Sequence, residues 1–173
     1  MSIQKLVENI KAKGNPTVAG LDARLEYIPD CLTEDIRREY GATLDGAMLR
    51  FNFGLIDALC DIVPAIKPQA AYYELLGPAG ARVLRATIRY AQDKGMYVIA
   101  DIKRNDIGAT ASAYAEAYLG RSSVWGEELP VYDCEAATVN AYLGTDGIEP
   151  FLKECRAREK SIYVLVKTSN KSS

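Results

Sequence analysis

Hydrophobic and polar positions divide the chain into short apolar runs separated by longer stretches with helical periodicity. The apolar runs predict five strands: Pro16–Asp22, Val63–Lys67, Met96–Lys103, Ala136–Asn140 and Ser161–Lys167. One predicted helical stretch begins after Thr33 as its N-cap, is broken near Gly41 and continues over Leu44–Ile62. The other predicted helices are Met1–Gly14, Tyr72–Lys94 with Gly95 as its C-cap, Ile107–Tyr118 and Gly147–Arg158. Strands that alternate with helices in this way are typical of a parallel α/β fold.

Two of the strands have nearly continuous apolar character, Val98–Ala100 and Ile162–Val166, which is expected of strands buried on both faces. No G-x-G-x-x-G or G-x-x-x-x-G-K-[ST] motif follows any strand, so neither a dinucleotide site nor a P-loop is predicted. No internal repeat, low-complexity tract or linker divides the sequence. We therefore expect a single domain over residues 1–173.

Polar side chains stand at or just past the carboxyl end of every predicted strand. They are Asp22, Lys67, Asp101 with Lys103, Asn140, and Thr168 with Ser169. In a (β/α)8 barrel this rim carries the active site, because all strands open onto one mouth. An open doubly wound sheet uses the same strand ends only at a switch point. The pattern favours the barrel.

The length does not match a complete barrel. The chain has 173 residues, whereas a (β/α)8 TIM barrel typically needs about 250 and rarely fewer than about 200. We expect an α/β chain holding about the first five βα units, as one barrel domain incomplete at its C-terminus. The polar tail Asn170–Ser173 follows a strand directly, where a loop would begin. Either the protein is truncated or the sequence is part of a longer chain.

Composition narrows the function classes. The formal net charge of -2 argues against a nucleic-acid binder. The sequence has no apolar run of the roughly 20 residues that cross a bilayer and no signal-peptide core at its start, so a cytoplasmic protein without a membrane partner is expected. The sequence has no histidine, which excludes Ser-His-Asp and Cys-His catalysis and histidine-ligated metals. The cysteines are expected to be buried or half-buried free thiols: Cys31, Cys60, Cys134 and Cys155.

The segment from Asp101 to Thr110 holds the most informative charges. On a strand, Asp101 and Lys103 point to the same face and Ile102 to the other. Opposite charges at a barrel mouth are costly to bury unless they pair. Asp106 follows at the start of the next helix, where a carboxylate is stabilised by the helix dipole. Alone, this pattern would indicate a solvated strand end, but Asp22, Lys67 and this pair could meet at one mouth.

At this point a family resemblance becomes specific. The spacing D-x-K-x-x-D-I, followed by a threonine four residues after the second aspartate, resembles the signature of orotidine 5'-phosphate decarboxylases. Other segments are similar to the bacterial type 2 branch of the same family, in order and with suitable spacing: Gly20–Asp22, Ala65–Gln69, Ile107–Tyr114, Thr138–Gly144 and Leu165–Asn170.

The resemblance implies roles for particular residues. Asp101 would face the substrate carboxylate, while Lys103 would stabilise the C6 carbanion and then protonate it. Lys67 and Asp22 would hold the ribose hydroxyls and complete the charged array, in which Lys67 and Asp106 count as catalytic residues with Asp101 and Lys103. Ser169 would hydrogen-bond the pyrimidine ring. Asp106 and Thr110 would reach into the neighbouring site of a homodimer. The substrate would be the nucleotide orotidine 5'-monophosphate, with neither metal nor organic cofactor.

The sequence departs from the family in one respect and leaves rival functions open. The glutamine and arginine that grip the phosphate in the family have no counterpart here. A metal-dependent sugar-phosphate decarboxylase or aldolase of the same superfamily is one rival, and a non-catalytic barrel fragment is another. Among single residues, we expect Trp125 to anchor its loop and Lys153–Lys160 to be a solvated helix end. Asn140 has even odds of touching substrate or bonding a neighbouring loop.

Overall fold

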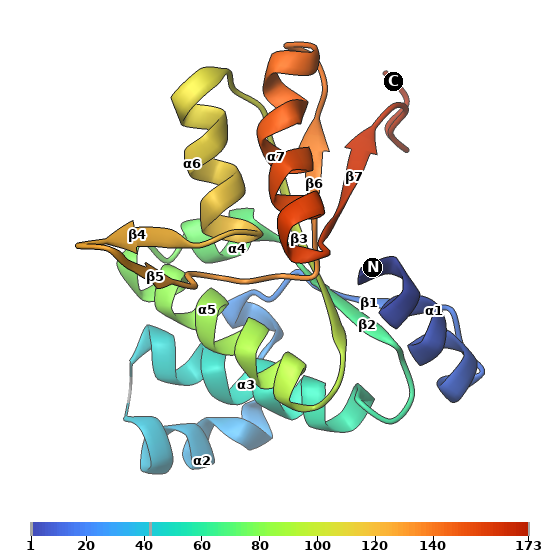
Figure 1. Cartoon of the computed structure of the whole chain (residues 1–173). Helices are drawn as coiled ribbons and strands as arrows, with labels where there is room; N and C mark the ends of the chain where they lie inside the picture. The colour runs from blue at the N-terminus through green and yellow to red at the C-terminus, as the bar shows by residue number, and fades with distance from the viewer. Residues whose placement is uncertain (1, 42, 173) are drawn as a thin grey trace. The chain divides into compact units, whose positions relative to one another are not determined.

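The computed structural model describes residues 2–41 and 43–172. The elements run in the order α1 (Ser2–Lys13), β1 (Val18–Leu21), the 3-10 helix η1 (Leu25–Tyr27), α2 (Asp30–Tyr40), α3 (Leu44–Leu59), β2 (Ala65–Pro68), α4 (Ala70–Glu74), α5 (Pro78–Asp93), β3 (Tyr97–Arg104), α6 (Gly108–Tyr118), β4 (Ser122–Val124), β5 (Glu127–Leu129), β6 (Ala136–Asn140), α7 (Thr145–Arg158) and β7 (Ser161–Leu165) (Figure 1). They form two compact units, residues 5–98 and residues 2–4 with 99–172.

The five predicted strands are present and pair in parallel. In the first unit β1 pairs with β2, and β2 pairs with the beginning of β3. In the second unit the remainder of β3 pairs with β6, which pairs with β7. The strand order is therefore β1-β2-β3-β6-β7. Parallel pairing with helical crossovers confirms the expected α/β class.

The unit of residues 5–98 builds its core from β1, β2 and the packed helices α2 to α5. α3 packs against α2 and α5, and α5 also packs against α4. A buried polar group lies within this apolar packing: the Asn52 amide nitrogen donates to the Tyr73 hydroxyl at 3.2 Å and to the Thr87 hydroxyl at 3.0 Å. Because all three side chains are at most 2% exposed, this network fixes the relative positions of α3, α4 and α5.

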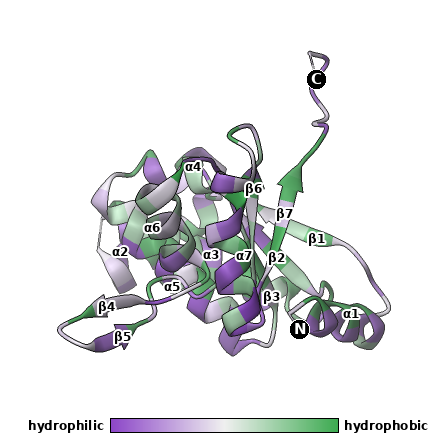
Figure 2. Cartoon of the chain, turned by 45° about the horizontal axis from the view of Figure 1, so that its top comes forward, coloured by the Kyte–Doolittle hydropathy of each residue, from purple (hydrophilic) through white to green (hydrophobic). Residues whose placement is uncertain are grey.

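The unit of residues 99–172 surrounds β3 and β6. The strand residues Ala136, Ala137 and Val139 are fully buried, as expected for a strand covered on both faces. The helices α6 and α7 of this unit pack against each other (Figure 1). Figure 2 shows β7 largely in the colour of hydrophobic residues. Two of its side chains, Tyr163 and Val164, are nevertheless 38% and 41% exposed.

Two helix predictions were wrong. The stretch Tyr72–Lys94 is not one helix, because α4 ends at Glu74 and α5 begins at Pro78. Gly77, with φ +59, turns the chain at the break, and Pro78 then occupies the first turn of α5, where its missing N–H costs nothing. Thr33 does not cap α2, which begins three residues earlier behind Pro29.

A β-hairpin occupies the segment that the sequence indicated as a loop. β4 and β5 pair antiparallel across Trp125 and Gly126, both at positive φ, which is the geometry of a two-residue hairpin turn. The sequence predicted that Trp125 anchors a loop. This prediction is wrong, because the Trp125 side chain is fully exposed at the hairpin turn. On β5, Glu128 pairs with Arg158 of α7 at 3.1 Å.

Two expectations about exposure hold only in part. The run Lys153–Lys160 is a solvated helix end at Lys153, Arg156 and Glu159, which are exposed. Lys160 is the exception, because its side chain is 14% exposed and its ammonium lies 2.7 Å from Asp133 Oδ1. Cys31 is exposed rather than buried, because α2 turns it towards solvent, whereas the other three cysteines are buried or half-buried. All four are free thiols.

Candidate active site

The end of β3 carries an irregularity in its pairing with β6. Ala100 pairs with Ala137, but the next paired residue, Arg104, is opposite Val139. Three residues of β3, positions 101–103, therefore lie opposite Thr138 alone. This is a β-bulge, in which the extra residues leave the ladder and the strand bends. Lys103 takes up the bend with φ +47, a backbone conformation that is costly for a residue other than glycine.

Asp101 and Lys103 meet at this bulge. Lys103 Nζ lies 2.5 Å from Asp101 Oδ1, and the Thr138 hydroxyl donates to the same oxygen at 2.9 Å. The Asp101 side chain is only 6% exposed and that of Lys103 is 44% exposed. A buried carboxylate needs such charged and hydrogen-bonding partners. The spacing predicted this meeting from regular alternation, whereas the structure achieves it through the bulge.

Asp106 and Thr110 flank the beginning of α6. The Asp106 carboxylate accepts a hydrogen bond from the Ile107 N–H at 2.8 Å, and its side chain stays partly exposed. Thr110 lies in the first turn of α6, on a stretch whose residues 107–110 are all exposed. The expected place of Asp106 just before a helix is therefore correct, and both side chains are accessible.

Asp22 and Lys67 belong to the other unit, at the carboxyl ends of β1 and β2. Lys67 is the register partner of Gly20, and Asp22 Oδ1 lies 3.5 Å from where a Cβ on Gly20 would be. Register partners in a parallel sheet point to the same face, as do residues two apart. The two predicted site residues therefore share one face of this strand pair. Asp22 also lies beside a cavity of about 210 Å³ lined by apolar Phe51 and Leu55.

The remaining predicted positions follow β6 and β7. Asn140 Oδ1 accepts a hydrogen bond from the Tyr142 N–H at 2.8 Å, in the segment that follows β6. The alternative contact of Asn140 with substrate stays a prediction. Ser169 lies beyond the end of β7 and is exposed. Next to it, the Thr168 hydroxyl contacts the Asn170 side chain.

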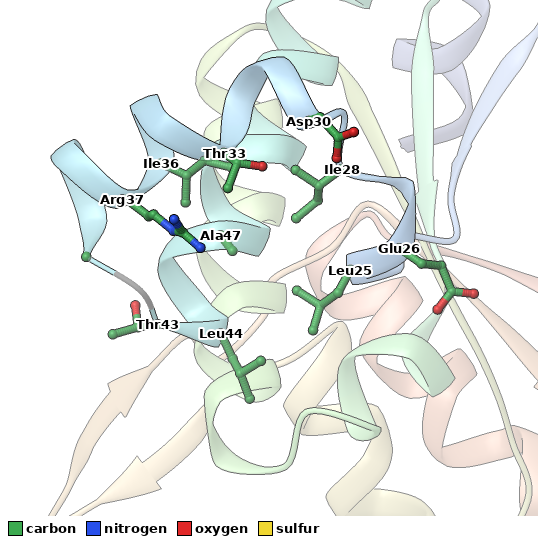
Figure 3. A pocket seen from close by; sticks show the side chains of 11 residues that line it. Leu25, Glu26, Ile28, Asp30, Thr33, Ile36, Arg37, Thr43, Leu44 and Ala47 are labelled. Atoms are coloured by element: carbon green, nitrogen blue, oxygen red, sulfur yellow. The ribbon is translucent and has the colours of Figure 1, made fainter.

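A larger cavity, of about 450 Å³, lies between η1, α2 and α3 (Figure 3). Its lining mixes apolar Leu25, Ile28 and Leu44 with polar Thr33 and Arg37. None of the predicted site residues lines it. We therefore do not place the chemistry there.

The part of the chain that the structure describes offers neither a metal-binding cluster nor a membrane-spanning helix. Within residues 2–41 and 43–172, no cluster of three or more His, Cys, Asp or Glu side chains is placed to hold a metal ion. In the same described part of the chain, no helix is both long and apolar enough to cross a membrane.

Comparison with known proteins now decides the family. Residues 42–173 match the family model described as "Orotidine 5'-phosphate decarboxylase / HUMPS family". The chain belongs to this family.

Members of the family resemble the chain in sequence and in structure. The orotidine 5'-phosphate decarboxylase of Rhodopirellula baltica is 45% identical over 161 residues, covering 91% of this chain and 51% of that protein. The enzyme of the same name from Caldicellulosiruptor saccharolyticus is 38% identical over 172 residues, covering 98% and 56%. The structure of Leishmania donovani OMP decarboxylase superposes with a TM-score of 0.75 at 30% identity, covering 99% of this chain and 56% of that one.

These matches confirm the expected family and the expected fold class, about the first five βα units of a (β/α)8 barrel. The chain spans about half the length of the curated relatives it matches. The matches also place the Asp101–Thr110 segment inside the part of the chain that the family model covers.

Sequence reasoning missed one residue of the site. Thr138 contacts Asp101 directly, yet the sequence pattern marks it only as the first residue of a segment similar to the family. The available signal was its position as the single hydroxyl within the buried run Ala136–Val139, since a polar side chain in such a strand needs a partner.

Proposed function

We propose that this chain carries the reaction centre of an orotidine 5'-monophosphate decarboxylase, which forms uridine 5'-monophosphate. The observation that carries the proposal is the 2.5 Å contact between the Lys103 ammonium and the buried Asp101 carboxylate. Family membership and the names of the relatives support the same substrate. A preorganised ammonium beside a reacting carbon is the kind of electrostatic group that can dominate catalysis.

In the proposed reaction, the bond between C6 of the pyrimidine and its carboxylate breaks. The electron pair stays on C6 and carbon dioxide leaves. Lys103 stabilises this carbanion by its charge and then transfers a proton from Nζ to C6. Asp101 faces the departing carboxylate and keeps Lys103 in place. With no histidine in the sequence, the lysine is the acid available at this position. The proposed reaction uses neither a metal nor an organic cofactor.

The other predicted residues would bind the nucleotide. Lys67 and Asp22 are proposed to hold ribose hydroxyls, which is compatible with their shared face at the ends of β1 and β2. Ser169 is proposed to hydrogen-bond the pyrimidine ring. We also keep the hypothesis that residues 1–173 are part of a single barrel domain.

We further propose a homodimer in which Asp106 and Thr110 reach into the partner's site. The exposed stretch at the beginning of α6 supports this proposal, since both residues are accessible there. A cytoplasmic location is proposed as well, because all four cysteines are free thiols, as expected in a reducing compartment.

The test follows the ultraviolet absorbance of orotidine 5'-monophosphate with the purified chain, with and without EDTA. Lys103→Ala is compared with the matched control Lys11→Ala, which removes an exposed lysine of α1. We expect turnover that is indifferent to EDTA, lost in Lys103→Ala and kept in Lys11→Ala. Turnover abolished by EDTA would instead support the metal-dependent sugar-phosphate enzymes. A folded chain with neither turnover nor binding of uridine monophosphate would support a non-catalytic fragment.

Sharing of sites can be tested separately by mixing two inactive variants, Lys103→Ala and Asp106→Asn. If each site takes residues from both subunits, mixed dimers contain one intact site. Random pairing would then restore roughly a quarter of the activity. Absence of any recovery, with subunit exchange shown by mass, would refute the shared site.

A further inference from the structure

Thr138 lies at the centre of the bulge that brings Asp101 and Lys103 together. Its hydroxyl oxygen accepts hydrogen bonds from the Ile102 N–H and the Lys103 N–H, both at 3.0 Å. The same hydroxyl donates to Asp101 Oδ1 at 2.9 Å. A threonine hydroxyl offers one donor and two acceptor positions, so these three contacts use its full capacity.

The two hydrogen bonds that the Thr138 hydroxyl accepts satisfy backbone N–H groups that the bulge removes from the β-sheet ladder. Residues 101–103 have no register partners in β6, and backbone N–H groups that leave a ladder need other acceptors. The Thr138 hydroxyl supplies an acceptor for two of them. It therefore replaces part of the missing ladder, at the residue where Lys103 adopts φ +47. An unusual backbone conformation of this kind persists only where its surroundings hold it.

The hydrogen bond that the Thr138 hydroxyl donates holds the Asp101 carboxylate in place. Asp101 Oδ1 receives both the Thr138 hydroxyl and the Lys103 ammonium. One side chain on β6 thus contacts the backbone that directs Lys103 and the carboxylate that Lys103 pairs with. A group so placed controls where the lysine ammonium sits relative to a bound substrate.

We propose that Thr138 is a positioning residue for the Asp101–Lys103 pair, acting through its hydroxyl. The proposal rests on the proposed decarboxylase function only for its effect on turnover. Its structural part, that the hydroxyl holds the bulge, is independent of the reaction. Because Thr138 acts through Asp101 and Lys103, its loss lowers the rate of the chemical step more than the binding of the nucleotide.

The experiment compares Thr138→Val, which removes the hydroxyl, with Thr138→Ser, which keeps it. Thr17→Val serves as the control, because Thr17 is exposed and precedes β1. We expect kcat for orotidine 5'-monophosphate to fall about 100-fold in Thr138→Val, the effect of a displacement of roughly 1 Å at a reacting group. KM should change less than about threefold, and Thr138→Ser should retain kcat to within about threefold. An unchanged kcat in Thr138→Val, or an equal loss in Thr138→Ser, would overturn the proposal.

Amide hydrogen exchange separates this proposal from the proposed function. Exchange at Ile102 and Lys103 should be about tenfold faster in Thr138→Val, because each amide loses its acceptor, and unchanged in Thr138→Ser and Thr17→Val. If the unmodified chain shows no turnover, the proposed function fails. The exchange rates of the Ile102 and Lys103 amides then decide alone whether Thr138 holds the bulge. Unchanged exchange in Thr138→Val would then refute it. Should Thr138→Val not fold, Thr138→Ala is judged by the same criteria.

Discussion

Lys94 Nζ lies 2.7 Å from Asp57 Oδ1, which joins the end of α5 to α3. The Tyr90 hydroxyl donates to the same carboxylate at 2.8 Å, and the Tyr90 ring stacks on Phe53 with centroids 4.1 Å apart. The hydrogen bonds from Lys94 and then Tyr90 lower the pKa of Asp57. Its ionised form is therefore favoured in the folded state.

This arrangement predicts a pH-dependent contribution to stability. A lowered pKa stabilises the folded state above the pKa of an unfolded aspartate, about 3.9, and the contribution is lost as the pH falls through the folded value. Asp57→Asn should therefore lower the urea midpoint at pH 7, and the difference from the unmodified chain should shrink below about pH 4. Asp61→Asn, at an exposed position, is the control. A difference that stays constant from neutral to acidic pH would contradict the prediction.

A side chain added at Gly80 is expected to clash severely with the neighbouring backbone. A Cβ at this position in α5 would lie 1.7 Å from the Tyr73 carbonyl oxygen. Gly80→Ala should therefore reduce the free energy of unfolding by about 3 kcal/mol, as expected for overpacking against backbone. Gly54→Ala in α3 is the matched substitution, since its Cβ would meet only the flexible end of Arg50 at 3.2 Å. It should gain up to about 1 kcal/mol from helix propensity. Urea unfolding of both variants tests the contrast, and equal effects would count against it.

Substitution of Trp125 is expected to raise the free energy of unfolding, in contrast to substitution of Gly80. Its φ of +51 is unfavourable for a large side chain, and full exposure leaves no packing to lose. Trp125→Asn should raise the free energy of unfolding by about 1 kcal/mol, because asparagine tolerates left-handed backbone. Thermal unfolding would show the gain. A loss of stability instead would mean that the ring makes contacts within the folded chain.

The cysteines should differ in reactivity. Burial raises the pKa of Cys155 to about 11 and also raises the pKa of Cys134, while Cys31 is exposed. Because the thiolate is the reactive form, iodoacetamide at pH 8 should alkylate Cys31 well before Cys155 and Cys134. Peptide mass analysis of the native protein gives the order. Rapid alkylation of Cys134 in folded protein would show that its site opens readily.

The sequence predicted the strands better than the turns between them. The continuous apolar run Val98–Ala100 correctly indicated a buried strand. The run Ile162–Val166 correctly indicated a strand, but the prediction that it is buried on both faces was wrong, because Tyr163, Val164 and Val166 are exposed. The break between α4 and α5 was missed because helical periodicity continues through it, although the pair Gly77-Pro78 marks a turn. The hairpin around Trp125 was missed because a Trp-Gly turn lacks the usual Asn-Gly signal.

The candidate site was predicted in part. Asp101 and Lys103 could be paired from their spacing and charge. The sequence marks the Thr138 hydroxyl as a polar group that needs a partner, but it does not identify that partner. The reason is that a register shift depends on which residues of two distant strands pair, and one strand alone does not specify that. Whether Asp22 and Lys67 act with them stays a prediction.

The bulge has an evolutionary consequence. Three residues of β3 opposite one residue of β6 form a fixed count, and a deletion or insertion between Ala100 and Arg104 would change it. A change of one residue would reverse the faces of the positions that follow. The interval from 100 to 104 should therefore keep its length across homologous genes. The tip of the β4–β5 hairpin carries no such constraint, and length variation is expected to accumulate there.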